Sequence, residues 1–179
     1  MLGAGLTALA ATLSISPAAQ ADVSSWAYAG GGASTFERHG GARGTQGLVQ
    51  LETGIGLSPE YPVAVGALFR SMTHLGEGTD WALMARAATS GFSNGDLGLA
   101  LDVGAYQRWW GQTSTGLLAT LGGGLPWGVN ISATGGYARP GEYMVGLTVG
   151  IDWARLTSHR STGGQWLPNY RLPVRADNL

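Results

Sequence analysis

The chain has 179 residues, of which 44% are hydrophobic, 12% are charged and 31 are glycine. This length allows one domain with a sizeable core, and the apolar content excludes a disordered chain, which would be richer in charge. Ten arginines, no lysine and eleven acidic residues give a net charge of −1. The chain therefore lacks the overall positive charge by which a protein attracts nucleic acid.

Residues 1–21 have the features of a secretory signal peptide. Residues 2–15 are apolar but too few to cross a bilayer as a helix, Pro17 ends the run, and Ala19-Gln20-Ala21 is a small-x-small cleavage pattern. We expect cleavage before Asp22 and export of a mature chain that has no cysteine and needs no disulfide. The alternative is a buried N-terminal helix, but the segment lacks amphipathic periodicity.

The mature chain alternates between bulky apolar residues and small or polar ones, as β-strands with two different faces do. In chain order the alternation predicts strands around residues 26–33, 49–56, 63–70, 80–87, 96–109, 113–122, 127–136 and 142–153. Turn signals separate them at 58–60, 76–78, 93–95, 122–124 and 139–141, and a longer loop is expected at 34–44. About eight strands joined by short turns predict an all-β fold, a closed antiparallel up-and-down barrel over residues 22–155. We expect an extended C-terminal tail over 156–179.

The two faces of these strands differ in kind. From Tyr143 to Trp153 every odd position is bulky and apolar, while the even positions apart from Met144 are small or polar. Many glycines share the polar face with the strand charges, and glycine is a poor choice for a water-exposed strand. Inside a narrow barrel, by contrast, glycine leaves room for larger side chains. The pattern favours a transmembrane barrel with lipid outside and a polar lumen. The alternative is a secreted, soluble, lipocalin-like barrel that binds a hydrophobic ligand.

Charged residues on the polar face would project into the lumen and should pair with one another, because unpaired buried charges are costly. The expected salt-bridge network, which would plug and stiffen the barrel, consists of Glu52, Arg70, Arg86, Asp102, Arg108 and Asp152. The alternative is a narrow conduction path lined by charge.

Aromatic residues gather near the predicted strand ends, where membrane barrels carry their interfacial girdles. The expected girdle consists of Trp26, Trp81, Trp109, Trp127, Tyr143 and Trp153. The alternative is that these are ordinary core aromatics.

The export signal, the alternating pattern and the strand count together resemble the small eight-stranded outer-membrane barrels, the OmpX and OmpA-transmembrane-domain class. The resemblance covers residues 24–155 and is architectural. It implies chain termini in the periplasm and insertion by the barrel-assembly machinery. The chain departs from this class in two respects: Trp153 is followed by a 26-residue tail instead of ending the last strand, and most predicted loops are short.

The tail holds the one constellation that suggests catalysis. His159-Arg160-Ser161, with Gly164 and Pro168-Asn169 downstream, is similar to the H-x-S segment of outer-membrane lipid A deacylases. The resemblance implies a histidine that activates a serine nucleophile for ester hydrolysis. The chain departs from that pattern at Pro173, where a glutamate is expected. A solvated tail with no catalytic role is the interpretation we favour.

No metal or cofactor is expected, since His39 and His74 lack ligand spacing and no glycine-rich run has the lysine of a phosphate loop. The sequence therefore predicts a structural or interaction protein of a bacterial outer membrane and not an enzyme. Its expected partners are membrane lipid and lipopolysaccharide, the assembly machinery, and an envelope protein bound through the tail, whose prolines and aromatics suit docking. A periplasmic or secreted location is the alternative.

Overall fold

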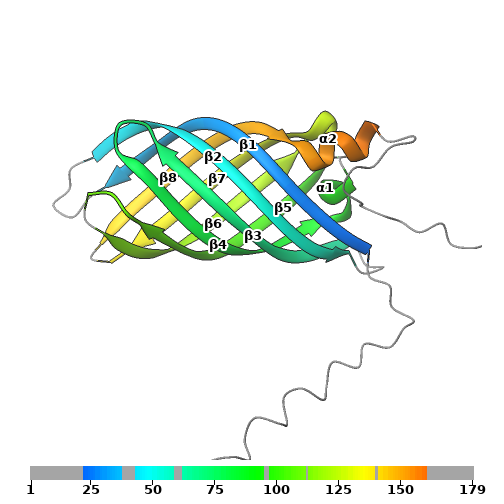
Figure 1. Ribbon diagram of the computed structural model, residues 1–179, viewed down its shortest axis with the longest axis horizontal. Coiled ribbons are helices and arrows are strands. Elements are labelled where there is room, and N and C mark those ends of the chain that lie inside the picture. Colours follow the sequence, from blue (N-terminus) through cyan, green and yellow to red (C-terminus); the bar gives the residue numbers. More distant parts are fainter. Residues whose placement is uncertain are drawn as a thin grey trace, which may run out of the picture.

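Eight antiparallel strands close into a barrel in the computed structural model, which describes residues 22–37, 43–58, 62–94, 97–111, 113–139 and 141–160 (Figure 1). The strands are β1 (Asp22–Glu37), β2 (Arg43–Ser58), β3 (Val63–His74), β4 (Gly78–Thr89), β5 (Gly98–Arg108), β6 (Ser114–Gly124), β7 (Val129–Ala138) and β8 (Glu142–Asp152). Three short helical elements accompany them: α1 (Ser90–Asn94), the 3-10 turn η1 (Pro126–Gly128) and α2 (Trp153–Arg160). The predicted all-β, closed, antiparallel barrel with strands in chain order is confirmed.

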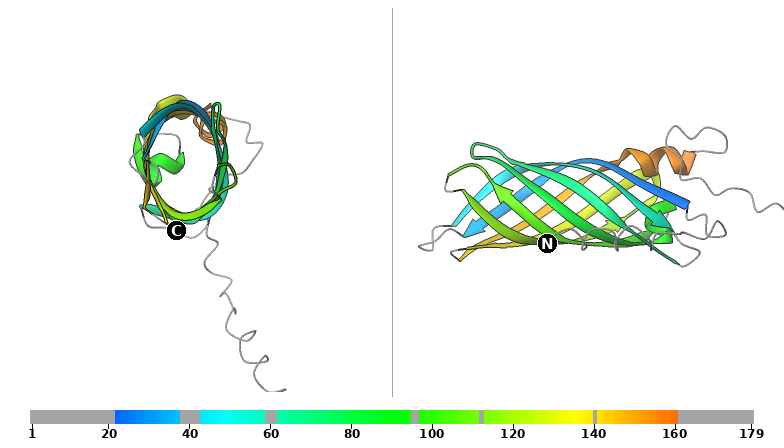
Figure 2. Two further views of the ribbon diagram at one scale, coloured as in Figure 1. Left: turned by 90° about the vertical axis from the view of Figure 1, so that its left-hand side faces the viewer. Right: turned by 60° about the horizontal axis from the view of Figure 1, so that its bottom comes forward.

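The strands are strongly inclined to the barrel axis. Following the paired residues once around the barrel from Trp26 leads back to β1 at Phe36, ten residues further along the strand. Eight strands with this stagger tilt by about 40°, and such a barrel is just wide enough for side chains to fill its interior. Viewed along the axis, the strands form a closed ring with α1 inside its outline (Figure 2, left).

The two ends of the barrel are built differently. At one end, called the hairpin end, short connections join β1 to β2, β3 to β4, β5 to β6 and β7 to β8. Gly76 and Gly141 take positive φ values of 88° and 89° in two of these turns, a conformation that favours glycine. The opposite end, called the helix end, carries α1, η1 and α2 (Figure 1). Among the described residues, no helix has the length and apolar character needed to cross a bilayer.

Several predicted boundaries are wrong. Residues 34–37 and 43–44 extend β1 and β2 and do not belong to a loop. The glycines 122–124 continue β6, and the turn follows at η1, which contains Trp127. Trp153 and residues 156–160 lie in α2, so this part of the expected extended tail is helical. The predicted signal peptide, residues 1–21, and the remainder of the tail, residues 161–179, lie outside the described residues.

Burial alternates along every strand, and the polar face is the buried one. In β4, for example, Asp80, Met84 and Arg86 are buried, while Trp81 and Leu83 are 51% and 69% exposed. The barrel exterior is therefore the bulky apolar face, and the lumen holds the charges. One aromatic is on the unexpected side: Trp26, predicted in the girdle, points into the lumen and is 1% exposed. The outward positions of β1 from Ser25 to Ala33 are all small residues. The sequence alternation in β1 therefore did not indicate which of its faces is the outward one.

Glycines make room for the large lumenal side chains. A Cβ added to Gly66 would lie 2.8 Å from Cζ3 of Trp26, and one on Gly56 would meet the same ring at 2.5 Å. Contacts this short are not tolerated, so these two positions must lack side chains for Trp26 to fit. Gly135 is different, since it faces outward and a Cβ there meets nothing within 4 Å.

This contrast gives a prediction for the fold. Gly66→Val should lower the free energy of unfolding by about 3 kcal/mol or abolish folding, because overpacking forces backbone and ring to move. Gly135→Val should be neutral or stabilising by up to about 1 kcal/mol, because valine favours strands. Urea unfolding of the refolded chain, followed by far-UV circular dichroism, measures both. Equal losses in the two variants would contradict the packing explanation.

Candidate functional site

The lumen contains a closed ring of four charged residues, the central cluster, formed by Glu52, Arg70, Arg86 and Asp102. They come from four consecutive strands, β2 to β5, whose register places Glu52 opposite Arg70 and Arg86 opposite Asp102. All four side chains are at most 2% exposed. Two arginines and two carboxylates make the cluster electrically neutral.

Each arginine in the central cluster binds both carboxylates. Nη2 of Arg70 lies 2.7 Å from Oε1 of Glu52 and 2.6 Å from Oδ2 of Asp102. Nη2 of Arg86 lies 2.8 Å from Oε2 of Glu52, and its Nε lies 2.7 Å from Oδ1 of Asp102. Because β3 and β5 are not neighbours, Arg70 and Asp102 meet across the lumen and tie non-adjacent walls together.

Hydroxyl groups extend the central cluster around the rest of the wall. Nη1 of Arg70 donates to Thr120, whose hydroxyl is also 2.9 Å from that of Thr134. The Arg86 guanidinium lies 5.2 Å from the Trp26 ring and 5.4 Å from the Phe92 ring, both within cation–π range. Strands β6 and β7 thus contribute to a network whose charges all come from β2 to β5.

A second group, the hairpin-end cluster, is built around Arg108. Its Nη1 lies 2.9 Å from Oε2 of Glu142 and its Nη2 lies 3.2 Å from Oδ2 of Asp80. Asp80 also accepts from Trp110 Nε1 at 2.8 Å and lies 3.2 Å from Nε2 of His74. The Arg108 guanidinium stacks over the Trp110 ring at 4.5 Å, so the group closes this end with both charge and aromatic surface.

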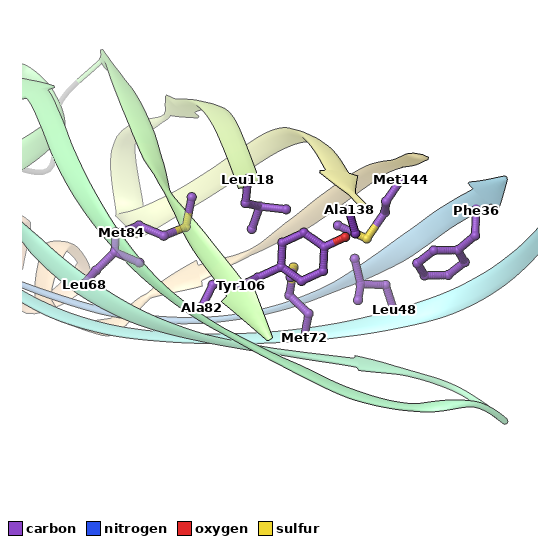
Figure 3. Packing of buried hydrophobic residues seen from close by; sticks show 10 residues of the cluster. All are labelled: Phe36, Leu48, Leu68, Met72, Ala82, Met84, Tyr106, Leu118, Ala138 and Met144. Atoms are coloured by element: carbon purple, nitrogen blue, oxygen red, sulfur yellow. The ribbon is translucent and has the colours of Figure 1, made fainter. Parts of the chain in front are cut away.

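An apolar layer separates the two clusters. Its side chains include Met72 on β3, Met84 on β4 and Tyr106 on β5, which lie between the two clusters along their strands (Figure 3). Leu68 also belongs to the layer but lies on the helix-end side of Arg70. The full layer is Phe36, Leu48, Leu68, Met72, Ala82, Met84, Tyr106, Leu118, Ala138 and Met144. These side chains are at most 3% exposed, so they fill the lumen between the charged groups.

The helix end is closed by Arg155 of α2, which is fully buried. Its Nε donates to the carbonyl of Phe92 at 2.6 Å, Nη1 to that of Val129 at 3.1 Å and Nη2 to that of Leu125 at 3.2 Å. Asp152 holds the start of α2 in place, because its Oδ1 accepts from the backbone N–H of Arg155 and of Ala27. One arginine thus joins α1, η1 and β7 across the mouth of the barrel.

The six expected lumenal charges all lie inside the barrel, but they form three groups and not one network. Four make the central cluster, Arg108 belongs to the hairpin-end cluster, and Asp152 belongs to the helix-end closure. The alternation of residues along the predicted strands already places Asp80 and Glu142 on the lumenal face. Sequence reasoning misses His74, Trp110 and Arg155, because each lies just beyond or at the edge of a predicted strand.

The other expected site residues are distributed as follows. Trp81, Trp109, Trp127, Tyr143 and Trp153 point outward, with 51% to 63% of their surface exposed. The backbone of His159 is part of α2, but its side chain is outside the described part of the chain. The whole of Ser161 is also outside the described part. Comparison of the chain with models of protein families, with curated proteins and with solved structures finds no match.

The central cluster predicts that replacing a buried arginine lowers the free energy of unfolding much more than replacing an exposed arginine. Arg70→Met should lower the free energy of unfolding by about 3–5 kcal/mol, because it leaves two buried carboxylates with one arginine. Arg43→Met, at an exposed pair with Glu37, should cost less than about 1 kcal/mol. Urea unfolding monitored by far-UV circular dichroism compares them.

The charge-balanced double variant Arg70→Met with Asp102→Asn tests whether the unpaired carboxylate causes this loss of stability. It restores a neutral cluster, so it should lose clearly less than the sum of the two single variants. Strictly additive losses would show that charge pairing is not what stabilises the lumen.

Proposed function

We propose that this chain is an outer-membrane β-barrel protein of a Gram-negative bacterium, with a structural or interaction role, a plugged lumen and no enzymatic activity. The observation that supports the proposal is the barrel exterior. Among the described residues, the outward strand positions between the two ends carry no charged side chain. Large apolar side chains there are widely exposed, such as Leu83 (69%), Leu117 (66%) and Leu147 (61%).

A continuous apolar exterior of this kind is unfavourable in water, because soluble monomers rarely expose apolar patches beyond a few hundred Å². The strands β3 to β8 have 10 to 12 residues, and at a tilt of about 40° they span roughly 25–30 Å along the axis. That height matches the apolar band of outer-membrane barrels, which is about 25 Å. The proposal therefore places lipid around the barrel wall.

The polar and aromatic residues at the hairpin end follow the order expected at a membrane interface. Hydroxyl pairs form an outward row near this end, with Thr35 bonded to Thr45 at 3.0 Å and Thr73 to Thr79 at 3.1 Å. On β1 and β2 the exposed ion pair of Glu37 with Arg43 lies beyond this row. The aromatic pair Trp81 and Trp109, with ring centroids 6.3 Å apart, lies next to this row. Aromatic rings prefer the headgroup level of a bilayer, which supports the proposed orientation of the wall.

At the helix end, Trp127 supports the same proposal. It is the one described non-glycine residue with positive φ, at 69°, and its side chain is 62% exposed. Such a conformation costs on the order of 1–3 kcal/mol and persists only where the surroundings impose it. An indole held outward at this cost suits an interfacial anchor, with the chain termini and α2 on the periplasmic side.

The filled lumen favours a structural or interaction role over conduction. The lumen is occupied along its axis by the hairpin-end cluster, the apolar layer, the central cluster and Arg155. The charges of both clusters are paired. The lumenal apolar side chains are packed against one another and buried, and the widely exposed ones are on the exterior, so a lipocalin-like cavity for a hydrophobic ligand is disfavoured. The partners we propose are outer-membrane lipid and lipopolysaccharide, the barrel-assembly machinery, and an envelope protein reached through the tail.

A charge scan of the exterior tests the proposal. In phospholipid vesicles, Leu147→Arg in the middle of β8 should cost about 2–4 kcal/mol of unfolding free energy, while Thr115→Arg, at the hairpin end of β6, should cost about 0–1 kcal/mol. Urea unfolding in vesicles gives both values, and heat-modifiable gel migration reports the folded barrel.

Two results would overturn the proposal. One is a folded, monomeric mature chain that stays soluble without detergent and does not float with vesicles. The other is a Leu147→Arg variant as stable in vesicles as Thr115→Arg.

A further inference from the structure

We infer that the outer wall near the helix end binds one phospholipid acyl chain in a defined groove; this inference rests on the proposed membrane location. The groove has a volume of about 460 Å³ and lies on the outward face of β5, β6 and β7. Leu97, Leu99, Leu125 and Ile131 surround it, and Gly123 lies between Leu99 and Ile131 in the ladders.

The glycine that opens the groove has no structural reason to be glycine. Its φ is not positive, and an added Cβ would meet only the Ile131 carbonyl oxygen, at an ordinary 3.8 Å. Glycine inside a strand weakens it and often marks a place where a ligand approaches closely. The lumenal glycines differ, since Gly66 would clash with Trp26. Gly123 therefore leaves open space on the exterior, as Gly135 does, but of these two glycines it is Gly123 that lines the groove.

The chemistry of the groove selects its occupant. None of its lining residues has a polar side chain. The backbone of Gly123 is already paired with Leu99 on one side and Ile131 on the other, so the wall offers no free strand edge. An extended peptide placed there would leave its own N–H and C=O groups unpaired in an apolar setting, which costs several kcal/mol per group. An acyl chain has no such groups, and only dispersion and shape are required of it.

The position of the groove identifies the leaflet. Leu125 directly precedes η1, where Trp127 is 62% exposed, and Trp153 of α2 is 51% exposed at the same end. Tryptophans of this kind mark the headgroup level. The groove begins beside that level and continues into the apolar band, as an acyl chain does below its ester group. The ligand is therefore a phospholipid of the leaflet at the helix end.

A photolabelling experiment tests this assignment. The refolded mature chain is placed in phosphatidylcholine vesicles that contain a small fraction of phosphatidylcholine with a diazirine in one acyl chain. After irradiation, mass spectrometry should find adducts on residues 97–99, 123–125 and 131 enriched several-fold over outward residues of β8 such as Val145 and Leu147. Gly123→Leu, whose Cβ would lie 3.8 Å from the Ile131 carbonyl oxygen, should fill the groove and reduce this enrichment to the level of β8.

Gly135→Leu is the matched control, because Gly135 also faces outward with open space but lies outside the groove. It should leave the enrichment unchanged. Uniform labelling of the unaltered chain, or equal loss in both variants, would overturn the groove assignment. An unlabelled groove beside a labelled β8 would also overturn it and would point to residues 161–179 or a second copy as the occupant.

Vesicle flotation separates the two proposals. A chain that floats and unfolds as a membrane barrel but labels uniformly leaves the proposed function standing and removes only the acyl-chain site. A chain that does not enter vesicles removes both.

Discussion

The narrow interior of an eight-stranded barrel is the constraint on which the rest of the structure depends. Eight strands enclose a space that side chains fill completely, so each lumenal residue is chosen against its neighbours across the axis. Trp26 fits because Gly56 and Gly66 have no side chains beneath its ring. The charges of the central cluster fit because each carboxylate has an arginine nitrogen within 3 Å, which offsets the loss of water around it.

The same constraint explains why the lumenal basic residues are arginine. Arg70 uses Nε, Nη1 and Nη2 to bind Glu52, Thr120 and Asp102 in one plane, which joins β2, β6 and β5. Arg155 binds three carbonyl groups in the same way. A lysine is a single charged point on a flexible stem and cannot bridge three walls at fixed angles. A composition poor in charge thus reflects a barrel whose strand charges are mostly lumenal and paired.

The fold could be predicted much further than the site. Alternation fixes which face each residue occupies, so the strand count, closure and lumenal position of Arg86 or Asp102 follow from sequence alone. Alternation does not fix height along the axis. The ten-residue stagger from Trp26 to Phe36 decides that Arg108 of β5 meets Glu142 of β8 across the lumen. Trp26 itself is mispredicted because its neighbours Ser25 and Ala27 are small, so hydrophobicity alone wrongly suggests that the ring faces outward.

The two ends of the lumen are closed by different means, and the difference reaches the outer wall. At the hairpin end the strands themselves supply Asp80, Arg108 and Glu142. At the helix end the closure comes from Arg155, beyond the last strand, held against the carbonyl of Leu125 and the backbone of Gly124. Gly124 and Leu125 also form part of the exterior groove. Arg155 therefore supports the inner side of the same wall that lipid would contact, so displacing α2 would reshape both.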